Sequence, residues 1–329
     1  MAILVSGGAG YIGSHCVYSL IDKGEEIIVV DNLKRGHEAA LHDDAGFYHG
    51  DIRDRDFLNR IFEDNEIEGV IHFAAHSIVG ESVTNPLEYY NNNLYGSMVL
   101  LEKMIKFNVR KIVFSSTAAV YGEPSKIPIV ESDATIPTNP YGETKLAVEK
   151  MLKWAHEAHN IKYVSLRYFN VAGAHSSGRI GEDHERETHL IPLILQVALE
   201  KRDSITIFGD DYDTYDGTCI RDYIHVMDLV DAHILALDKL RRQAGSFIYN
   251  LGNGQGFSVK EIIDAARRVT GHPIPAMIGQ RRKGDPSKLI ASSRKAQDEL
   301  GWKTRYRKID DIIASAWKWH SSHPQGYNE

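Results

Sequence analysis

Cysteine and long apolar runs are both scarce in this sequence. Cys16 and Cys219 are its two cysteines, too few for a disulfide framework, so we expect a reduced, cytoplasmic setting. The longest apolar runs, such as residues 27–30, have the length of a strand and are far too short to cross a bilayer. The apolar start at residues 2–5 is also too short for the core of a signal peptide and leads directly into glycines.

An excess of positive charge is missing as well. The 38 Lys and Arg residues are outnumbered by 45 Asp and Glu residues, which gives a formal net charge of −7. Such a surface has no general attraction to a nucleic-acid backbone, so we expect neither a nucleic-acid nor a membrane partner. With 43% hydrophobic residues over 329 positions, the chain can bury a large core as one big domain or two modest ones.

Glycine, by contrast, is concentrated near the start of the chain. An apolar stretch at residues 3–5 is followed by Gly7, Gly10 and Gly13 and then by an expected helix over residues 14–23. A strand, a glycine loop and a helix in this order are the context of a dinucleotide fingerprint, whose pyrophosphate lies at the helix N-terminus. The three glycines serve the tight turn, the approach of the backbone to the pyrophosphate, and the packing of helix on strand. The spacing is looser than Gly-x-Gly-x-x-Gly, and a glycine run alone also fits a plain loop.

An acidic residue at the end of the next apolar stretch strengthens this interpretation. Asp31 follows Gly13 by 18 residues, close to the offset of about 20 expected for a carboxylate that binds the adenosine ribose. A carboxylate there would repel a 2′-phosphate, so the sequence favours NAD over NADP. Lys34 and Arg35 point the other way, but we interpret them as solvated loop charges.

Apolar strands alternate with helices through the first half of the chain. Further strands are expected at residues 27–30, 47–49, 70–75, 111–115 and 163–168, and helices at residues 54–64, 86–107 and 141–159. This alternation predicts an α/β fold with a doubly wound, Rossmann-like parallel sheet, whose ligands lie beyond the carboxyl ends of the strands. We predict that residues 1–170 form this NAD-binding domain. We predict that residues 171–329 form a smaller mixed α/β nucleotide-sugar domain. The assignment of segments near 221–229 and 247–251 stays open, because either can return to the first domain.

A tyrosine and a lysine share one face of the helix expected over residues 141–159. Tyr141 and Lys145 are four residues apart, so both side chains lie on the same side. A phenol is a poor base near neutrality because its reference pKa is roughly 10, and an adjacent ammonium lowers that pKa. The pair therefore fits a general acid/base, although an isolated Tyr-x-x-x-Lys more often reflects simple packing. Ser115, Ser116 and Thr117 follow a strand at the predicted ligand edge and offer hydrogen-bonding hydroxyl groups.

The sixteen histidines raise the question of a metal site. His72 and His76 are four apart but lack the carboxylate partner of a helical metal motif. His184 and His189 lie in a loop-rich stretch in which the sequence indicates no further ligands. We therefore expect no metal.

With the glycine loop, Thr117 and Tyr141-x-x-x-Lys145 in hand, the chain resembles the extended short-chain dehydrogenase/reductase superfamily. Within it, longer blocks resemble the UDP-glucose 4-epimerase family, which belongs to the NAD-dependent epimerases/dehydratases, and the resemblance runs from residue 3 to residue 327. These blocks are residues 80–82, 86–93, 167–175, 217–229, 319–320 and 323–327.

The resemblance implies roles by position. Tyr141 would be the catalytic acid/base, Lys145 its partner and a ligand of the nicotinamide ribose, and Thr117 a hydroxyl near the sugar. The ligand edge and the resemblance together give the cofactor-binding set: Gly7, Gly10, Tyr11, Ile12, Gly13, Asp31, Asn32, Asp51, Ile52, Phe73, Ala74, Ala75, Ser77, Asn92, Ser115, Tyr141, Lys145, Tyr168 and Phe169.

A UDP-hexose would occupy the second half of the site. The implied substrate-binding set is Thr117, Tyr141, Asn170, His189, Leu190, Thr206, Ile207, Phe208, Arg221, Tyr223, Arg282, Asp285 and Leu289. Arg221 and Arg282 also make chemical sense without the resemblance, because guanidinium groups bind a diphosphate well. Four positions depart from the family pattern: Ser77 replaces a lysine of some members, Thr117 the commoner serine, His189 a frequent asparagine, and Leu289 a bulky tyrosine of some bacterial members.

The implied reaction is the reversible epimerisation of UDP-galactose to UDP-glucose in galactose metabolism. Tyr141 would take the proton of the 4-hydroxyl while a hydride passes to tightly bound NAD, and the 4-keto sugar would turn over and take the hydride back. Ala118 and Ala119 follow Thr117 where related dehydratases have acidic residues, which disfavours a dehydratase or decarboxylase. A UDP-pentose or UDP-uronate 4-epimerase and a catalytically silent dinucleotide sensor remain as alternatives, although a sensor would not need Tyr141 and Lys145.

Two finer expectations follow from the resemblance. Leu289 leaves more room beside the sugar than a tyrosine would, so we expect some turnover of UDP-N-acetylgalactosamine. A homodimer would pack through residues 86–107 and 141–159, which would make the catalytic helix an interface helix as well.

Overall fold

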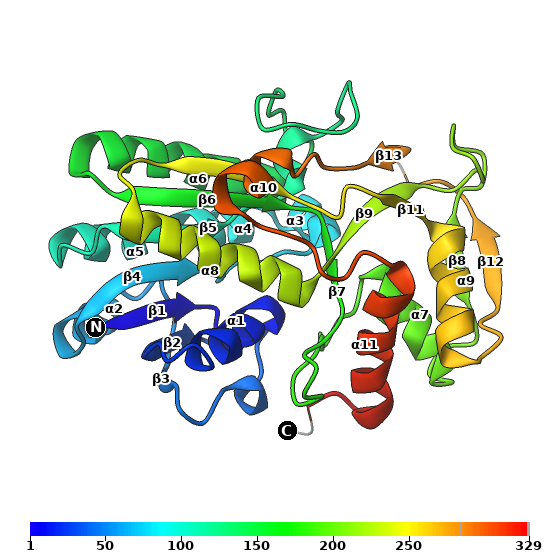
Figure 1. Ribbon diagram of the computed structural model, residues 1–329, viewed down its shortest axis with the longest axis horizontal. Helices are drawn as coiled ribbons and strands as arrows, with labels where there is room; N and C mark the ends of the chain where they lie inside the picture. Colours follow the sequence, from blue (N-terminus) through cyan, green and yellow to red (C-terminus); the bar gives the residue numbers. More distant parts are fainter. Residues whose placement is uncertain (283–284, 328–329) are drawn as a thin grey trace.

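A seven-stranded, wholly parallel sheet forms the larger part of the molecule (Figure 1). The computed structural model describes residues 1–282 and 285–327. The strand order is β10-β6-β5-β4-β1-β2-β3, so the chain winds outward in both directions from β1. The bounds are β1 Ala2–Ser6, β2 Ile27–Asp31, β3 Gly46–His49, β4 Ile67–His72, β5 Lys111–Ser115, β6 Lys162–Tyr168 and β10 Phe247–Leu251.

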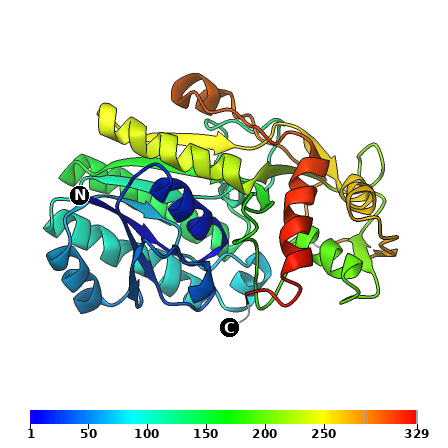
Figure 2. The same cartoon turned by 60° about the horizontal axis from the view of Figure 1, so that its bottom comes forward.

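Helices cover both faces of this sheet, which explains why its strands are apolar without alternation (Figure 2). Helices α1 (Tyr11–Ile21) and α8 (Val226–Arg242) pack together over one face, with Cys16, Leu20 and Leu237 in the core between them. Helices α2 (Arg55–Asp64), α5 (Gly96–Lys106) and α6 (Pro140–His159) cover the other face. The predicted doubly wound α/β fold is confirmed.

Three element boundaries differ from the expected ones. Helix α1 begins at Tyr11, three residues early, because Gly10 already provides its extended N-cap. Strand β4 ends at His72, so the following residues form the loop beyond the strand end. The expected helix over residues 86–107 is divided into α4 (Pro86–Tyr89), a π-helical stretch (Tyr90–Tyr95) and α5. Such π stretches are frequent at functional sites.

Smaller sheets lie beyond the carboxyl ends of the large one, at the right of Figure 1. Strand β9 (Ile220–His225) is the centre of one of them and pairs with β7 (Asn170–Ala172), β11 (Gly256–Ser258) and β13 (Lys288–Leu289). Strands β8 (Ile205–Phe208) and β12 (Ala276–Gly279) form a separate parallel pair. Helices α7 (Leu190–Ala198), α9 (Val259–Thr270) and α11 (Ile309–Ser322) share an apolar core in this part of the molecule. Helix α3 (Val79–Thr84) contacts α6, and α10 (Arg294–Leu300) contacts β10 and α8.

The structure locates the segments near residues 221–229 and 247–251, whose domain the sequence leaves open. Strand β10 pairs with β6 at the edge of the large sheet, and α8 packs against β5 and β6, whereas β9 belongs to the smaller sheet. The domain boundary at residue 170 stays a prediction, and residues 283–284 and 328–329 of the predicted second domain lie outside the described residues. In the described part of the chain, no helix combines the length and the apolar character needed to cross a membrane.

Candidate active site

The glycine loop joins β1 to α1, and the reason for glycine differs among Gly7, Gly10 and Gly13. Gly7 has a φ of +77°, and a Cβ there would lie 2.5 Å from the backbone nitrogen of Ala74. A Cβ on Gly13 would lie 2.0 Å from the carbonyl oxygen of Gly7, so the fold itself requires both glycines. A Cβ on Gly10 would meet only that same oxygen, at 3.4 Å. Packing does not explain Gly10, and an approaching pyrophosphate would.

The first turn of α1 is suited to an anion. Gly10 is its N-cap, and no side chain caps the helix. The N–H groups of a first helical turn have no partner within the helix and carry the positive end of the helix dipole. Tyr11 and Ile12, both predicted cofactor residues, stand in this turn, and the Tyr11 hydroxyl donates to the carbonyl oxygen of Gly173 at 2.6 Å. This donor set fits the diphosphate of a dinucleotide.

Asp31 ends β2 directly beside the loop. Its carboxylate accepts hydrogen bonds from the backbone nitrogens of Ala9, at 3.0 Å, and Leu33, at 2.9 Å. Burial raises the pKa of Asp31, and these backbone donors oppose that shift. The carboxylate is thereby held at the edge of the sheet, where a ribose of NAD would meet it.

Asn32 and Asp51 form the next contact along this edge. Asn32 Nδ2 donates to Asp51 Oδ2 at 2.9 Å, and the guanidinium of Arg53 pairs with both Asp51 oxygens at 2.9 and 2.8 Å. The Arg53 hydrogen bonds hold the pKa of Asp51 well below its usual range. Arg53 was not among the predicted residues, because an arginine two positions after an aspartate has no distinguishing sequence signal.

The π-helical stretch presents two buried asparagines to the same edge. Asn93 accepts from the backbone nitrogen of His76 at 2.7 Å and donates to its carbonyl oxygen at 3.0 Å. Asn93 also donates to the Thr144 hydroxyl at 3.1 Å. Asn92 Nδ2 in turn donates to Asn93 Oδ1 at 3.0 Å. Asn93 therefore fastens the loop after β4 to the catalytic helix, while the predicted ligand Asn92 lies next to it.

Helix α6 begins at the residues that predict acid/base chemistry. Asn139 is the N-cap and accepts from the Gly142 nitrogen at 2.9 Å, and Pro140 occupies the first turn. Tyr141 and Lys145 are 8% and 4% exposed, and Lys145 Nζ donates to the Ser115 carbonyl oxygen at 2.8 Å. The helix thus brings both side chains to the end of β5.

The electrostatics of Tyr141 differ from the expectation. Burial raises the pKa of Tyr141, and a hydrogen bond with the Thr117 side chain opposes this shift. The Lys145 ammonium is directed to the Ser115 carbonyl oxygen. Burial also lowers the pKa of Lys145 to about 7, against the opposing charge of Glu149. The expected net lowering of the Tyr141 pKa is therefore not found.

A buried polar network lies behind these residues. Glu149, one turn after Lys145, accepts from Ser116 at 2.5 Å and from the Arg167 guanidinium at 2.9 and 2.5 Å. Arg167 also donates to the Tyr121 hydroxyl at 2.9 Å. Every member of the network is at most 5% exposed, so it fixes α6 against β6. Glu149 and Arg167 are buried charges far apart in sequence, and no local pattern reveals such a pair.

Four of the predicted sugar residues lie on β9 or on strands that pair with it. In register, Asn170 of β7 faces Tyr223, and Leu289 of β13 faces Arg221. Leu289 and the predicted cofactor residue Phe169 pack on one small apolar cluster with Val120, Tyr121, Ile129 and Leu146. Because Leu146 belongs to α6, Leu289 lies near the catalytic helix.

Basic groups line the outer part of this region. Arg282 stacks over the Phe208 ring, 4.0 Å from its centroid, and lines a cleft together with Tyr212 and Asp285. Arg221 forms an ion pair with Asp285. Thr206 and Ile207 occupy β8 beside Phe208. The two arginines are therefore brought to one region, with Arg221 held by a carboxylate.

Sequence comparison assigns this chain to a known family. The profile of the NAD-dependent epimerase/dehydratase family matches residues 3–252. The chain belongs to this family.

The relatives of this epimerase/dehydratase chain match it over its whole length. It is 62% identical over 328 residues to the UDP-glucose 4-epimerase of Halalkalibacterium halodurans, covering 100% of this chain and 98% of that protein. The UDP-glucose 4-epimerase of Lacticaseibacillus casei is 57% identical, with 100% and 99% covered. The crystal structure of the UDP-glucose 4-epimerase of Bifidobacterium longum with NAD⁺ and UDP is 45% identical, with 99% and 100% covered and a TM-score of 0.94.

Within the epimerase/dehydratase fold, the predicted cofactor residues follow the strand ends of the large sheet. Ser115 ends β5, and its hydroxyl lies 2.7 Å from His233 Nε2. Tyr168 ends β6, and burial raises its pKa. Ile52 is buried, Phe73 and Ala74 donate their backbone N–H groups to Ser6, and Ala75 follows them. Ser77 is exposed, and the structure gives it no contact that supports a ligand role.

One prediction about histidines was wrong. His184 and His189 were expected to lack further ligands, yet Glu182 and Glu187 lie with them, and all four ligand atoms are within 4.8 Å of one another. His189 is the N-cap residue of α7, and Leu190 begins that helix. The signal was the spacing Glu-x-His-x-x-Glu-x-His, which is visible in the sequence.

Proposed function

We propose that this chain inverts C4 of UDP-hexoses and interconverts UDP-galactose and UDP-glucose, with NAD retained through turnover. The observation that supports this most is the convergence of Tyr141, Lys145 and Thr117 at the carboxyl edge of an NAD-binding sheet. The full-length relatives named UDP-glucose 4-epimerase support it as well.

The cofactor fits the edge described above. When bound, NAD supplies the acceptor and donor for the hydride at C4. Gly10 and the first turn of α1 would hold its pyrophosphate, Asp31 a ribose, and Lys145 the ribose next to the nicotinamide.

The chain itself manages the proton. As the phenolate, Tyr141 takes the proton from the sugar 4-hydroxyl, and the resulting phenol returns it after the sugar has presented its other face. The Thr117 hydroxyl stabilises the phenolate, which compensates in part for burial. The residues directly after Thr117 are Ala118 and Ala119 in a short 3-10 helix, with no carboxylate to remove a neighbouring proton. The chemistry therefore stops after oxidation and reduction at C4.

The nucleotide is the pivot of the reaction. Arg221 and Arg282 bind the diphosphate, and the sugar lies toward Tyr141 between Asn170, Tyr223 and Leu289. Leu289 packs against the apolar cluster that contains Leu146, and a leucine there leaves more room next to the sugar than a tyrosine would. This supports turnover of UDP-N-acetylgalactosamine as a second activity.

The exposed apolar side chains support a homodimer. Leu87 of α4 and Trp154 of α6 are 81% and 69% exposed, and Val83 of α3, four residues before Leu87, is also exposed. Large exposed apolar side chains on neighbouring helices are typical of an interface. Light scattering of the parent and of Trp154→Glu tests this: a parent dimer and a variant monomer support it, and a parent monomer refutes it.

Two buried free thiols are consistent with a cytoplasmic setting.

The decisive experiment for the activity omits added cofactor. The purified chain is incubated with UDP-galactose alone, and UDP-glucose and protein-bound dinucleotide are measured. Conversion with NAD bound supports the proposal. Bound NAD without conversion would favour a dinucleotide sensor, and conversion of UDP-pentoses or UDP-uronates in preference to UDP-galactose would favour the related epimerases.

A further inference from the structure

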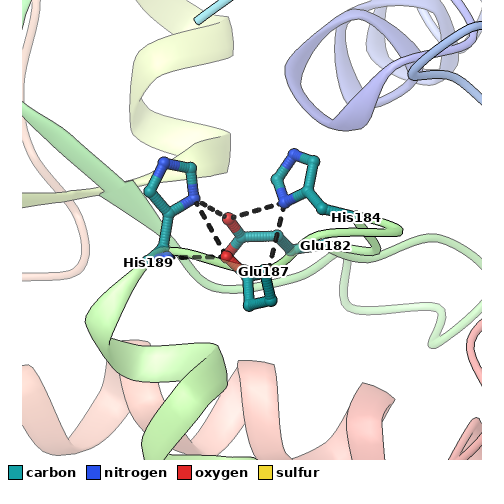
Figure 3. A group of neighbouring side chains, drawn as sticks. All are labelled: Glu182, His184, Glu187 and His189. Carbon is teal, nitrogen blue, oxygen red and sulfur yellow. Dashed lines mark hydrogen bonds and ion pairs between the residues drawn. The ribbon is translucent and has the colours of Figure 1, made fainter. Parts of the chain in front are cut away.

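Four side chains converge between β7 and α7, outside the group that handles the proton. Glu182, His184 and Glu187 come from the connecting segment, and His189 is the N-cap residue of α7 (Figure 3). The two imidazole rings lie on either side of the two carboxylates (Figure 3). The Glu182 and Glu187 side chains are 3% and 7% exposed, whereas that of His189 is 52% exposed. The carboxylates are thus buried, and one side of the group remains open to solvent.

Both rings direct the same nitrogen, Nδ1, toward both carboxylates. His189 Nδ1 lies 2.5 Å from Glu182 Oε1 and 3.7 Å from Glu187 Oε1. His184 Nδ1 lies 3.2 Å from Glu187 Oε2 and 3.7 Å from Glu182 Oε1. Two independent His–Glu pairs would need only one carboxylate for each ring. Here one ligand atom from each of the four residues lies within 4.8 Å of the other three.

We propose that Glu182, His184, Glu187 and His189 bind one divalent transition-metal ion of the zinc class. Imidazole nitrogen and carboxylate oxygen are ligands that zinc uses at about 2.0–2.2 Å, usually four of them in a tetrahedron. That geometry places ligand atoms about 3.3 Å apart. The separations of 3.2 and 3.7 Å are close to this. The contact of 2.5 Å between His189 and Glu182 must open by about 0.8 Å, and the widest separation in the group, which reaches 4.8 Å, must close.

The charge of the group also suits a divalent ion. Two buried carboxylates are expensive without compensation, and one divalent ion with two neutral imidazoles balances them. The ion would join three residues of the connecting segment to the first turn of α7, where His189 and Leu190 are predicted to meet the nucleotide sugar. Its role is structural, and the measurement of metal binding does not depend on the proposed epimerase activity.

The test uses the full-length, NAD-bound chain and Co²⁺ as the probe, after treatment with a chelator. We expect one Co²⁺ per chain with the strong visible absorption of a four-coordinate site. His184→Asn and Glu187→Gln should each weaken Co²⁺ binding roughly 100-fold. The matched control is His42→Asn, because His42 Nδ1 lies 3.8 Å from a single carboxylate, that of Asp44, and should leave Co²⁺ binding unchanged.

A second measurement keeps the proposal testable if a variant does not fold. Crystals of the parent are soaked in Zn²⁺, and anomalous diffraction is recorded at the zinc edge. A peak between the four side chains supports the proposal. No peak there, no uptake of Co²⁺ by the parent, or equal uptake by the parent and both variants would overturn it and leave a His–Glu ion-pair cluster.

Discussion

The cofactor side and the sugar side of this molecule are built in different ways. On the cofactor side, strands of one sheet end at the same edge, and we propose that backbone groups of the glycine loop do much of the binding. On the sugar side, residues from β7, β8, β9, β13 and α7 meet through pairings between distant segments. The first arrangement follows from local pattern, and the second depends on tertiary contacts. Tyr141 lies where the two sides meet, and the largest effect is expected there.

Replacing Tyr141 with phenylalanine should separate binding from chemistry. The variant keeps the ring that packs at the start of α6 but loses the proton-transferring hydroxyl, so we expect turnover of UDP-galactose to fall roughly 10²–10⁴-fold. The amount of NAD bound per chain should be unchanged. Turnover within a few-fold of the parent would show that another group moves the proton.

The next effect tests whether the support behind the catalytic helix belongs to the fold. Arg167→Met leaves Glu149 buried without its cation, and we expect the free energy of unfolding to fall by about 3–5 kcal/mol in urea denaturation. The control is Arg268→Met, whose partner Asp310 is exposed and whose loss should cost less than about 1 kcal/mol. The double variant Arg167→Met/Glu149→Met should recover most of the stability. Equal costs for the buried and exposed arginines would contradict this account.

These contrasts explain what the sequence could predict. The strand–loop–helix order around Gly7 to Gly13 and the position of Asp31 depend on local spacing, so the sheet and its cofactor edge were predictable. Glu149 and Arg167 became partners only through the packing of α6 on β6, and the chain between them gives no hint of it. The group at Glu182 to His189 was local as well, but its spacing matches no standard metal motif, so it was missed. The pKa of Tyr141 depends on burial, which sequence does not reveal.

A pair of glycine variants sharpens the difference between folding and binding within the cofactor side. Gly13→Ala places a Cβ 2.0 Å from the Gly7 carbonyl oxygen, so we expect a lower melting temperature and loss of bound NAD. Gly10→Ala meets only that oxygen at 3.4 Å, so the NAD-free chain should melt close to the parent while NAD retention falls. Thermal unfolding and the NAD content of the purified chains measure both effects. Full NAD retention by Gly10→Ala would argue against a close approach of the pyrophosphate.

The buried lysine predicts a pH dependence of stability. Burial lowers the pKa of Lys145 to about 7, whereas an unfolded lysine titrates near about 10.4. Between these values the unfolded chain binds more protons than the folded chain, so the free energy of unfolding rises with pH, by at most about 1.4 kcal/mol per pH unit.

Urea denaturation of the NAD-free chain between about pH 7 and 9 measures this slope. Lys145→Met should flatten it, because the group that titrates is gone. Lys150→Met changes an exposed lysine of the same helix and should leave the slope as in the parent. A slope that persists in Lys145→Met would assign it to another group.

The smallest effect tests the sugar side. Leu289 packs against the apolar cluster that contains Leu146, so Leu289→Tyr adds volume where the sugar is proposed to lie. We expect the ratio of kcat/KM for UDP-N-acetylgalactosamine to that for UDP-galactose to fall about tenfold, a typical value for a steric change in a pocket. Leu289→Met conserves volume and should leave the ratio unchanged. If Leu289→Tyr processes the acetylated sugar as well as the parent does, Leu289 does not limit this space, and the sugar lies elsewhere on the β9 sheet. The cofactor side would be unaffected by that result, because its contacts come from different strands.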